Sequence, residues 1–214
     1  MGRPATGGGA LNDFGDVRGE IGFHHVSLYE CHRTVLEDVH LTIPAHSTVA
    51  IVGRSASEKA ALASLVPRFR DPSEGTITID GIDVRTICLE SLRRQVFKTT
   101  LGCDLFQTSI LHSLKLDSPI LILEEAVAEL DSRSEFYIQE VLKRLTRGRT
   151  TLMITRRLSW IRSADEVVVL EAGKMVERGP PELLEALGGR YAELHDKEKY
   201  RKTKRLLAEE KAAF

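Results

Sequence analysis

The stretch from Thr48 to Leu65 constrains the fold of this chain more than any other. Residues 48–53 form an apolar run, rich in β-branched side chains, that stops at Gly53. Small polar residues follow as far as Lys59, and residues 61–65 then continue as a mainly apolar segment. This order of residue types predicts a strand, a loop and a helix, in which the loop joins a buried strand to a buried helix face.

The spacing between Gly53 and Lys59 matches the frame of a phosphate-binding loop. In such a loop, glycines let successive backbone N–H groups face the phosphates, and the lysine reaches the terminal phosphates. A Ser or Thr directly after the lysine holds Mg²⁺. We therefore predict a nucleotide-binding segment made of Gly53, Arg54, Ser55, Ala56, Ser57, Glu58, Lys59, Ala60 and Ala61.

Three positions of this segment depart from the frame, because Ala56 and Glu58 replace glycines and Ala60 replaces the metal-binding hydroxyl. A Cβ at Ala56 would cost about 1–2 kcal/mol if the loop needed a positive φ there. The Glu58 carboxylate would face polyphosphate, and like unit charges 4 Å apart repel by roughly 4 kcal/mol at an effective dielectric of 20. Glu58 could also pair with Lys59. We expect weak or lost nucleotide binding, and a loop without its usual ligand for Mg²⁺.

The overall composition indicates that the function depends on specific sites, because the chain has almost no net charge to attract a partner. The chain has 214 residues, is 42% hydrophobic, and carries 30 basic against 31 acidic side chains. This length allows a sizeable α/β core, and the near-zero net charge argues against nucleic acid as a partner. The three cysteines lack a C-x-x-C pair, which favours a reducing, cytoplasmic location and argues against a zinc site. No apolar run reaches the ~20 residues of a membrane span.

The first part of the chain reads as a Gly-rich leader over residues 1–19, followed by two half-buried strands at 21–28 and 35–43. Because neighbouring side chains of a strand alternate, we expect His24 and His25 to point to opposite faces, as surface and packing residues. The remaining pattern predicts strands at 76–81, 95–100, 119–125 and 150–155, a hairpin over 166–177, and helices at 91–94, 108–116, 132–145 and 183–213.

The strand at 119–125 ends in two adjacent carboxylates, Glu124 and Glu125. Its continuous apolar run is typical of a buried parallel strand, and ligands bind at the carboxyl edge of such sheets. We interpret the pair as a metal and water site. Without Mg²⁺, two adjacent carboxylates need a cation, and Arg156 is one candidate for that role.

Several short stretches, in this order along the chain, resemble the ATPase domain of exporter-type ABC transporters, with the bacterial lipid A exporters as the most similar group. They are residues 52–55 (Val-Gly-Arg-Ser), 63–65 (Ala-Ser-Leu), 117–123 (Asp-Ser-Pro-Ile-Leu-Ile-Leu) and 154–159 (Ile-Thr-Arg-Arg-Leu-Ser). The likeness covers most of residues 20–195. It implies an α/β fold with a P-loop NTPase-like three-layer core, a mainly parallel sheet, and an N-terminal antiparallel β part.

The resemblance also assigns roles to single positions. Lys59 matches the lysine that grips phosphate, Glu125 matches the catalytic glutamate that polarises the attacking water, and Glu124 stands where the family has a metal-site aspartate. The aromatic that stacks on adenine falls on Glu30, with Tyr29 beside it. The remaining matches are Leu101 for the glutamine of the Q-loop, Asp131 for the end of the D-loop, and Arg156 for the switch histidine that orients the γ-phosphate.

In the family, a helical subdomain with a Leu-Ser-Gly-Gly-Gln signature stands between the Q-loop strand and the strand at 119–125. Here residues 110–116 run directly into 117–119, and the signature occurs nowhere in the sequence. The resemblance thus implies a leader at 1–19, a truncated ABC ATPase-like domain at 20–195 and a charged C-terminal helix at 196–214.

Three functions remain open from the sequence. The first is an ATP-binding subunit related to lipid export, impaired in hydrolysis, and placed by resemblance at transmembrane subunits on the cytoplasmic face of the inner membrane or in a homodimer. The second is a non-catalytic relic that acts as a protein-interaction or regulatory module. The third is a divergent NTPase that uses Lys59 and Glu125 with altered metal use.

Overall fold

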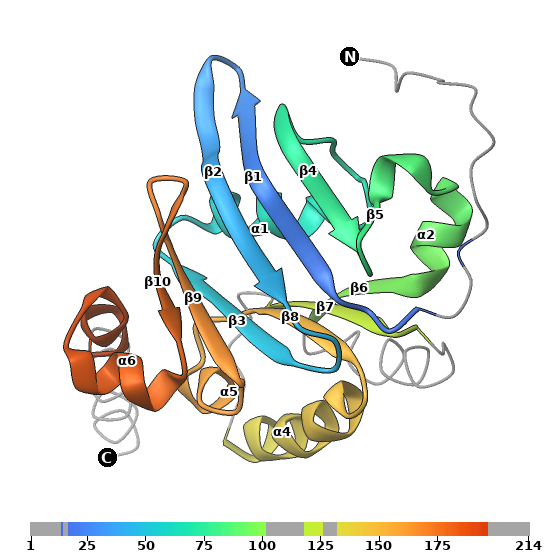
Figure 1. The fold of residues 1–214 in the computed structure, drawn as a ribbon. Helices are drawn as coiled ribbons and strands as arrows, with labels where there is room; N and C mark the ends of the chain where they lie inside the picture. Colours follow the sequence, from blue (N-terminus) through green and yellow to red (C-terminus); the bar gives the residue numbers. More distant parts are fainter. Residues whose placement is uncertain (1–13, 15–16, 102–117, 126–131, 197–214) are drawn as a thin grey trace, which may run out of the picture.

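The computed structural model describes residues 14, 17–101, 118–125 and 132–196, which form two β-sheets with helices between and outside them (Figure 1). The strands are β1 (Ile21–Glu30), β2 (Arg33–Ile43), β3 (Thr48–Gly53), β4 (Glu74–Ile79), β5 (Ile82–Asp83), β6 (Val96–Leu101), β7 (Ile120–Glu125), β8 (Thr150–Ile154), β9 (Glu166–Glu171) and β10 (Lys174–Gly179). The helices are α1 (Ala56–Leu65), the 3₁₀ turn η1 (Val84–Thr86), α2 (Leu89–Gln95), α4 (Ser132–Thr146), α5 (Leu158–Ile161) and α6 (Pro181–Leu187).

The smaller sheet has the strand order β2-β1-β4-β5 and is antiparallel. The larger sheet has the order β10-β9-β3-β8-β7-β6, and all its neighbouring pairs are parallel except β9 with β10. This arrangement confirms the predicted α/β class, with a mainly parallel sheet and an N-terminal antiparallel part.

The main core lies between the two sheets, where α1 contacts both β2 and β3 (Figure 1). The opposite face of the larger sheet packs on α4 and α5, with Leu121, Met153 and Trp160 in the contact. A third apolar cluster joins α5 and α6 to β3 and β9. The larger sheet is therefore covered on both faces, as its continuous apolar strands require.

Gly53 ends β3 at a position that only glycine fits. Its φ is +153°, and a Cβ there would lie 2.4 Å from the carbonyl oxygen of Leu170 on β9. The strand before it is fully buried at Val49, Ala50 and Ile51 because β8 and β9 flank it on both sides. The glycine is thus retained for sheet packing, whatever the loop binds.

The prediction that His24 and His25 face opposite sides of β1 is wrong. The β1–β2 register jumps between the pairs Phe23↔Leu41 and Val26↔Val39, so two residues of β1 stand opposite the single residue His40. His25 has a φ of +50°, and both histidines are exposed. This β-bulge breaks the alternation and turns both imidazoles to the solvent face.

The C-terminal prediction of one helix over 183–213 is also wrong in the described part. Helix α6 ends at Gly188, which has a φ of 67° in the left-handed region, and a new helical stretch covers residues 190–196. The turn at Gly188 and Gly189 separates the two. Residues 197–214, the predicted helix at 108–116 and nearly all of the leader at 1–19 lie outside the described residues.

Candidate phosphate-binding site

The loop after β3 is shorter than expected, because α1 begins at Ala56 and not at Ala61. Ser55 is the N-cap, and its Oγ accepts a hydrogen bond of 3.3 Å from the backbone N–H of Glu58. Neither Ala56 nor Glu58 has a positive φ. Both residues lie in the first turn of α1, so the backbone strain considered at Ala56 does not arise.

Lys59 is buried, with 4% of its surface exposed, and its Nζ is directed at its own loop. The ammonium donates to the carbonyl oxygens of Gly53 at 2.5 Å and Ser55 at 3.1 Å. No ion pair between Lys59 and Glu58 occurs among the described contacts, so the pairing considered from the sequence is not formed. A phosphate group would have to draw Nζ away from these two carbonyls.

At the other predicted part of the site, Glu124 pairs with Lys98 rather than with Arg156. Glu124 Oε2 lies 3.1 Å from Lys98 Nζ, and the two side chains are only 25% and 20% exposed. In the parallel register of β6 and β7, Thr100 stands beside Glu124, and Lys98 comes two residues before Thr100. Because side chains alternate along a strand, those of Lys98 and Glu124 lie on the same face of the sheet. No ion pair between Arg156 and Glu124 is among the described contacts, and the side chain of Glu125, the other carboxylate of the predicted pair, lies outside the described part of the structure.

Sequence reasoning missed Lys98. The available signal was a lysine in the middle of the strand predicted at 95–100. The next strand predicted along the chain, at 119–125, ends in two carboxylates. A lysine in that place needs an anionic partner when the strand is buried. Strand order could not be read from the sequence, so the partner was not identified.

Arg54 and Arg156 line the same hollow, which has a volume of about 590 Å³. It lies where β3 and β8 end, and both arginines are exposed there. The structure therefore brings the phosphate-loop segment and the predicted switch position together. The hollow is lined by Val52, Gly53, Arg54, Thr155, Arg156, Leu158, Ile161, Tyr191, Leu194 and His195.

The buried wall of this hollow includes Tyr191, which is 1% exposed and whose hydroxyl has no hydrogen-bond partner among the described residues. Burial raises the pKa of the Tyr191 phenol, and the nearby Glu185 carboxylate raises it further. The phenol therefore stays neutral where a free tyrosine would begin to ionise.

The two residues predicted at the adenine position, Tyr29 and Glu30, lie at the end of β1. Tyr29 is 47% exposed, and its backbone N–H donates to Ser73 Oγ at 3.0 Å. Glu30, where the family has its aromatic, forms an ion pair with Arg70. An acidic residue held by an arginine therefore replaces the stacking ring.

Other predicted site residues are described only in part. Glu125 ends β7 beside Leu101 of β6, and the side chains of both lie outside the described part of the structure. Asp131 also lies outside the described residues. Ala60 lies in α1 and offers no hydroxyl.

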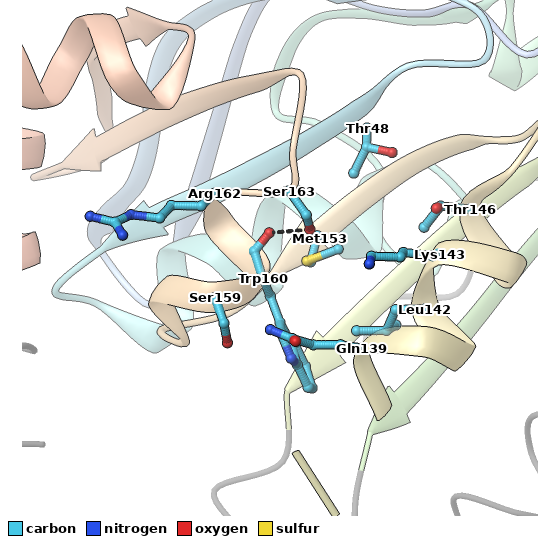
Figure 2. A pocket seen from close by; sticks show the side chains of 10 residues that line it. All are labelled: Thr48, Gln139, Leu142, Lys143, Thr146, Met153, Ser159, Trp160, Arg162 and Ser163. Atoms are coloured by element: carbon cyan, nitrogen blue, oxygen red, sulfur yellow. Dashed lines mark hydrogen bonds between the residues drawn. The ribbon is translucent and has the colours of Figure 1, made fainter. Parts of the chain in front are cut away.

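A second hollow of about 280 Å³ opens between α4, α5 and the start of β3 (Figure 2). Trp160 and Gln139 both line it, and Ser163 Oγ donates to the Trp160 carbonyl at 2.7 Å (Figure 2). None of the residues predicted for the nucleotide site lines it. This hollow is therefore separate from the phosphate loop.

Two further searches covered only the described residues. They contain no helix that is both long and apolar enough to cross a bilayer. They also contain no group of three or more His, Cys, Asp or Glu side chains already arranged around one metal position.

Comparison with known proteins agrees with this geometry. The sequence profile of the ABC transporter family matches residues 36–159. An ATP-dependent lipid A-core flippase of Legionella pneumophila (strain Paris) is 35% identical over 237 positions, which cover 84% of this chain and 40% of that protein. A protein of the same name from Alkalilimnicola ehrlichii is 37% identical over 239 positions, covering 84% of this chain and 41% of its own.

Among solved structures, a bacterial Atm1-family ABC exporter with ATP bound superposes with a TM-score of 0.73. It is 25% identical in sequence, and the match covers 88% of this chain and 44% of that one. The chain thus spans about two fifths of the length of the curated relatives it matches. Because the family profile covers more than half of its residues, this chain belongs to the ABC transporter family.

Proposed function

We propose that this chain is an ATP-binding subunit related to lipid export whose site binds ATP weakly, almost independently of Mg²⁺, and does not hydrolyse it. The observation that carries this proposal is the ion pair between Lys98 and Glu124. Through this ion pair, the Lys98 ammonium neutralises the Glu124 carboxylate, which stands where the resemblance places a metal-site aspartate.

The residues present do not fit a catalytic Mg²⁺. A metal site of this kind needs a hydroxyl after the lysine, and Ala60 has none. It also needs an available carboxylate, and Glu124 is held by Lys98 at 3.1 Å. Because Mg²⁺ is reluctant to give up its water, losing two contacts from the chain leaves little to hold it.

Phosphate binding is weakened by a separate cause. Lys59 donates to the carbonyls of Gly53 and Ser55, so binding a phosphate must first break these contacts. Glu58 lies in the first turn of α1, where its negative charge offsets the attraction of the helix N-terminus for an anion. Both effects lower the affinity for phosphate.

Loss of hydrolysis follows because phosphoryl transfer depends mainly on positioning and electrostatic stabilisation. Glu125 is retained as the residue that would polarise water, and Arg156 replaces the histidine that orients the phosphate. A base without a positioned phosphate contributes little to rate.

The alignments support a missing segment in this chain. The match to the Legionella relative has 237 positions, whereas 84% of 214 residues is about 180, so about 57 positions face gaps in this chain. The Burkholderia orbicola match gives the same excess, because 90% of the chain is about 193 residues in 250 positions. This length suits the helical subdomain with the signature, which we propose is absent between β6 and β7.

The remaining features of the proposal concern organisation. We propose a leader at 1–19, the truncated ABC ATPase-like domain at 20–195 and a charged C-terminal helix at 196–214. The partners are transmembrane subunits of an exporter or a second copy of the chain, at the cytoplasmic face of the membrane. Nucleic acid is not a partner, because the net charge of −1 provides no general attraction.

A non-catalytic interaction or regulatory module is the second candidate. The contacts of Lys59 and Glu124 favour this candidate. Lys59 donates to the Gly53 carbonyl and Glu124 pairs with Lys98, so both charged groups have partners within the chain when no nucleotide is bound. A chain that never bound ATP would need such pairing to bury these charges.

Isothermal titration of the chain with ATP, with and without Mg²⁺, separates these functions. The proposal expects a Kd weaker than about 100 μM that changes less than about threefold when Mg²⁺ is added. No binding at all would favour the interaction module. Micromolar binding that requires Mg²⁺ would contradict the proposal and favour a divergent NTPase.

A further inference from the structure

The bulge in β1 gathers three histidines on the outer face of the smaller sheet. His24 and His25 stand opposite His40 on β2, between the register pairs Phe23↔Leu41 and Val26↔Val39. All three histidines are exposed, while the flanking Phe23 and Val26 are fully buried. The core therefore fixes the backbone on both sides of the three imidazoles.

The rings lie close to one another. The ring centroids of His25 and His40 are 5.0 Å apart with an interplanar angle of 36°, and those of His24 and His40 are 5.9 Å apart. With metal–nitrogen distances of about 2.0–2.1 Å, two imidazoles bound at roughly 90–110° place their centroids about 4.5–5.2 Å apart. The His25–His40 pair already has this separation.

The ring of His25 is oriented by Asp38. His25 Nδ1 lies 2.7 Å from Asp38 Oδ1, and because an ionised carboxylate only accepts, Nδ1 carries the proton. Nε2 is then the basic nitrogen. A carboxylate that holds the far nitrogen of a histidine is the usual support of a metal-binding imidazole.

The backbone holds this arrangement at a cost. His25 and Asp38 have φ values of +50° and +49°, in the left-handed region that few non-glycine residues occupy. Such conformations cost about 1–3 kcal/mol each and persist only where the surrounding structure fixes them. The same two residues carry the imidazole–carboxylate contact.

We propose that His25 and His40 form a surface site for a divalent transition metal such as Ni²⁺, Zn²⁺ or Cu²⁺, with Asp38 orienting His25. These metals bind imidazole nitrogen well, whereas Mg²⁺ and Ca²⁺ prefer oxygen ligands. The site is separate from the phosphate loop and holds whether or not the chain binds ATP.

His24 flanks this site without joining it. Its Nε2 lies 3.0 Å from Thr78 Oγ1, and the ring fits over Gly22, where a Cβ would approach Nε2 to 2.6 Å. Within the described residues no three ligand side chains converge on one point as they lie. The site is therefore a two-imidazole site, and water completes the coordination of the metal.

Titration of the untagged chain with Ni²⁺ tests the proposal. His25→Asn is the first variant, because Asn tolerates the left-handed backbone while removing the imidazole. We expect His25→Asn and His40→Asn each to weaken Ni²⁺ binding at least tenfold. Asp38→Asn should weaken it by about tenfold, since loss of such a supporting carboxylate costs 10–100-fold.

The controls are His32→Asn, an exposed histidine in the β1–β2 turn with a φ of +62°, and thermal unfolding of every variant. His32→Asn should leave the affinity unchanged, and His24→Asn should lower it less than threefold. Unchanged Ni²⁺ affinity in the His25→Asn/His40→Asn double variant would overturn the proposal. A loss at His24→Asn as large as that at His40→Asn would overturn the two-imidazole geometry.

Discussion

The phosphate loop after β3 and the strand edge at β6 and β7 are two parts of one predicted site, and their polar groups are paired in different ways. At the loop, α1 starts at Ala56 with Ser55 as its N-cap, and Lys59 donates to the carbonyl oxygens of two loop residues. At the edge, the strands keep their register and a side chain, Lys98, neutralises Glu124. The lysine of the loop is therefore held by backbone carbonyls, and the carboxylate at the strand edge is held by a side chain of the neighbouring strand.

Lys59→Met should have the largest effect on this comparison. If Lys59 now serves the loop, its loss leaves the Gly53 and Ser55 carbonyls without their charged donor, which should lower the free energy of unfolding by about 2–3 kcal/mol. Urea unfolding measures this.

Lys174→Met is the matched control, because Lys174 pairs with Glu37 at the surface and should change stability by less than about 1 kcal/mol. If Lys59→Met were as stable as the parent chain, Lys59 would be a free ligand and the loop would not be closed.

Lys98→Met tests the edge in the same way. Glu124 would remain a partly buried carboxylate without its cation, and we expect a loss of about 1–2 kcal/mol in urea unfolding. Adding Glu124→Gln should recover most of that loss, because it removes the unpaired charge. A double variant no more stable than Lys98→Met would show that the ion pair does not neutralise this edge.

Glu58→Gly and Ala56→Gly sharpen the account of the loop. Both residues have helical φ values, so neither replacement relieves strain, and only Glu58→Gly removes a charge. Glu58→Gly should improve ATP affinity about tenfold, which is about 1.4 kcal/mol, and Ala56→Gly by less than about twofold. Equal gains in isothermal titration would mean that backbone geometry limits binding.

Tyr191→Phe probes the buried wall of the hollow that Arg54 and Arg156 also line. Because burial raises the pKa of the Tyr191 phenol, its contribution to stability is present below its ordinary value of about 10 and declines as the pH rises above it. Removing an unpaired buried hydroxyl should be neutral or stabilising by about 1 kcal/mol at pH 7.

The same replacement should reduce the alkaline loss of stability. Thermal unfolding between pH 7 and pH 11 measures both effects. A parent chain and a Tyr191→Phe variant with the same alkaline slope would show that this phenol is not the titrating group.

Most of the fold was predicted from the sequence, because each strand is recognisable from the apolar or alternating pattern of its own side chains. The apolar runs at β3, β7 and β9 and the turn at Gly173 indicated the elements within a few residues of their bounds. The bulge at His25 was not predicted, because it depends on how β1 and β2 pair. The helix predicted at 183–213 runs past Gly188, where α6 ends.

The site was harder to predict, because its contacts join residues far apart in the sequence. The phosphate-loop frame was read directly from Gly53 and Lys59, but the partners of Lys59 depend on the exact start of α1. Lys98 meets Glu124 only because β6 and β7 are neighbours in the sheet. A pattern along the chain contains no information on that order.

Phosphate release in the presence of ATP and Mg²⁺ is the most direct test of the central claim, that the site keeps its frame but has lost its chemistry. We expect no release above background from the purified chain, because Ala60, Arg156 and the Lys98–Glu124 pair leave no positioned phosphate. Restoring Ala56→Gly, Glu58→Gly, Ala60→Ser, Glu124→Asp and Arg156→His together should recover nucleotide binding without turnover like that of the family. Release by the parent chain that rises with protein concentration and is abolished by Glu125→Gln would contradict the account.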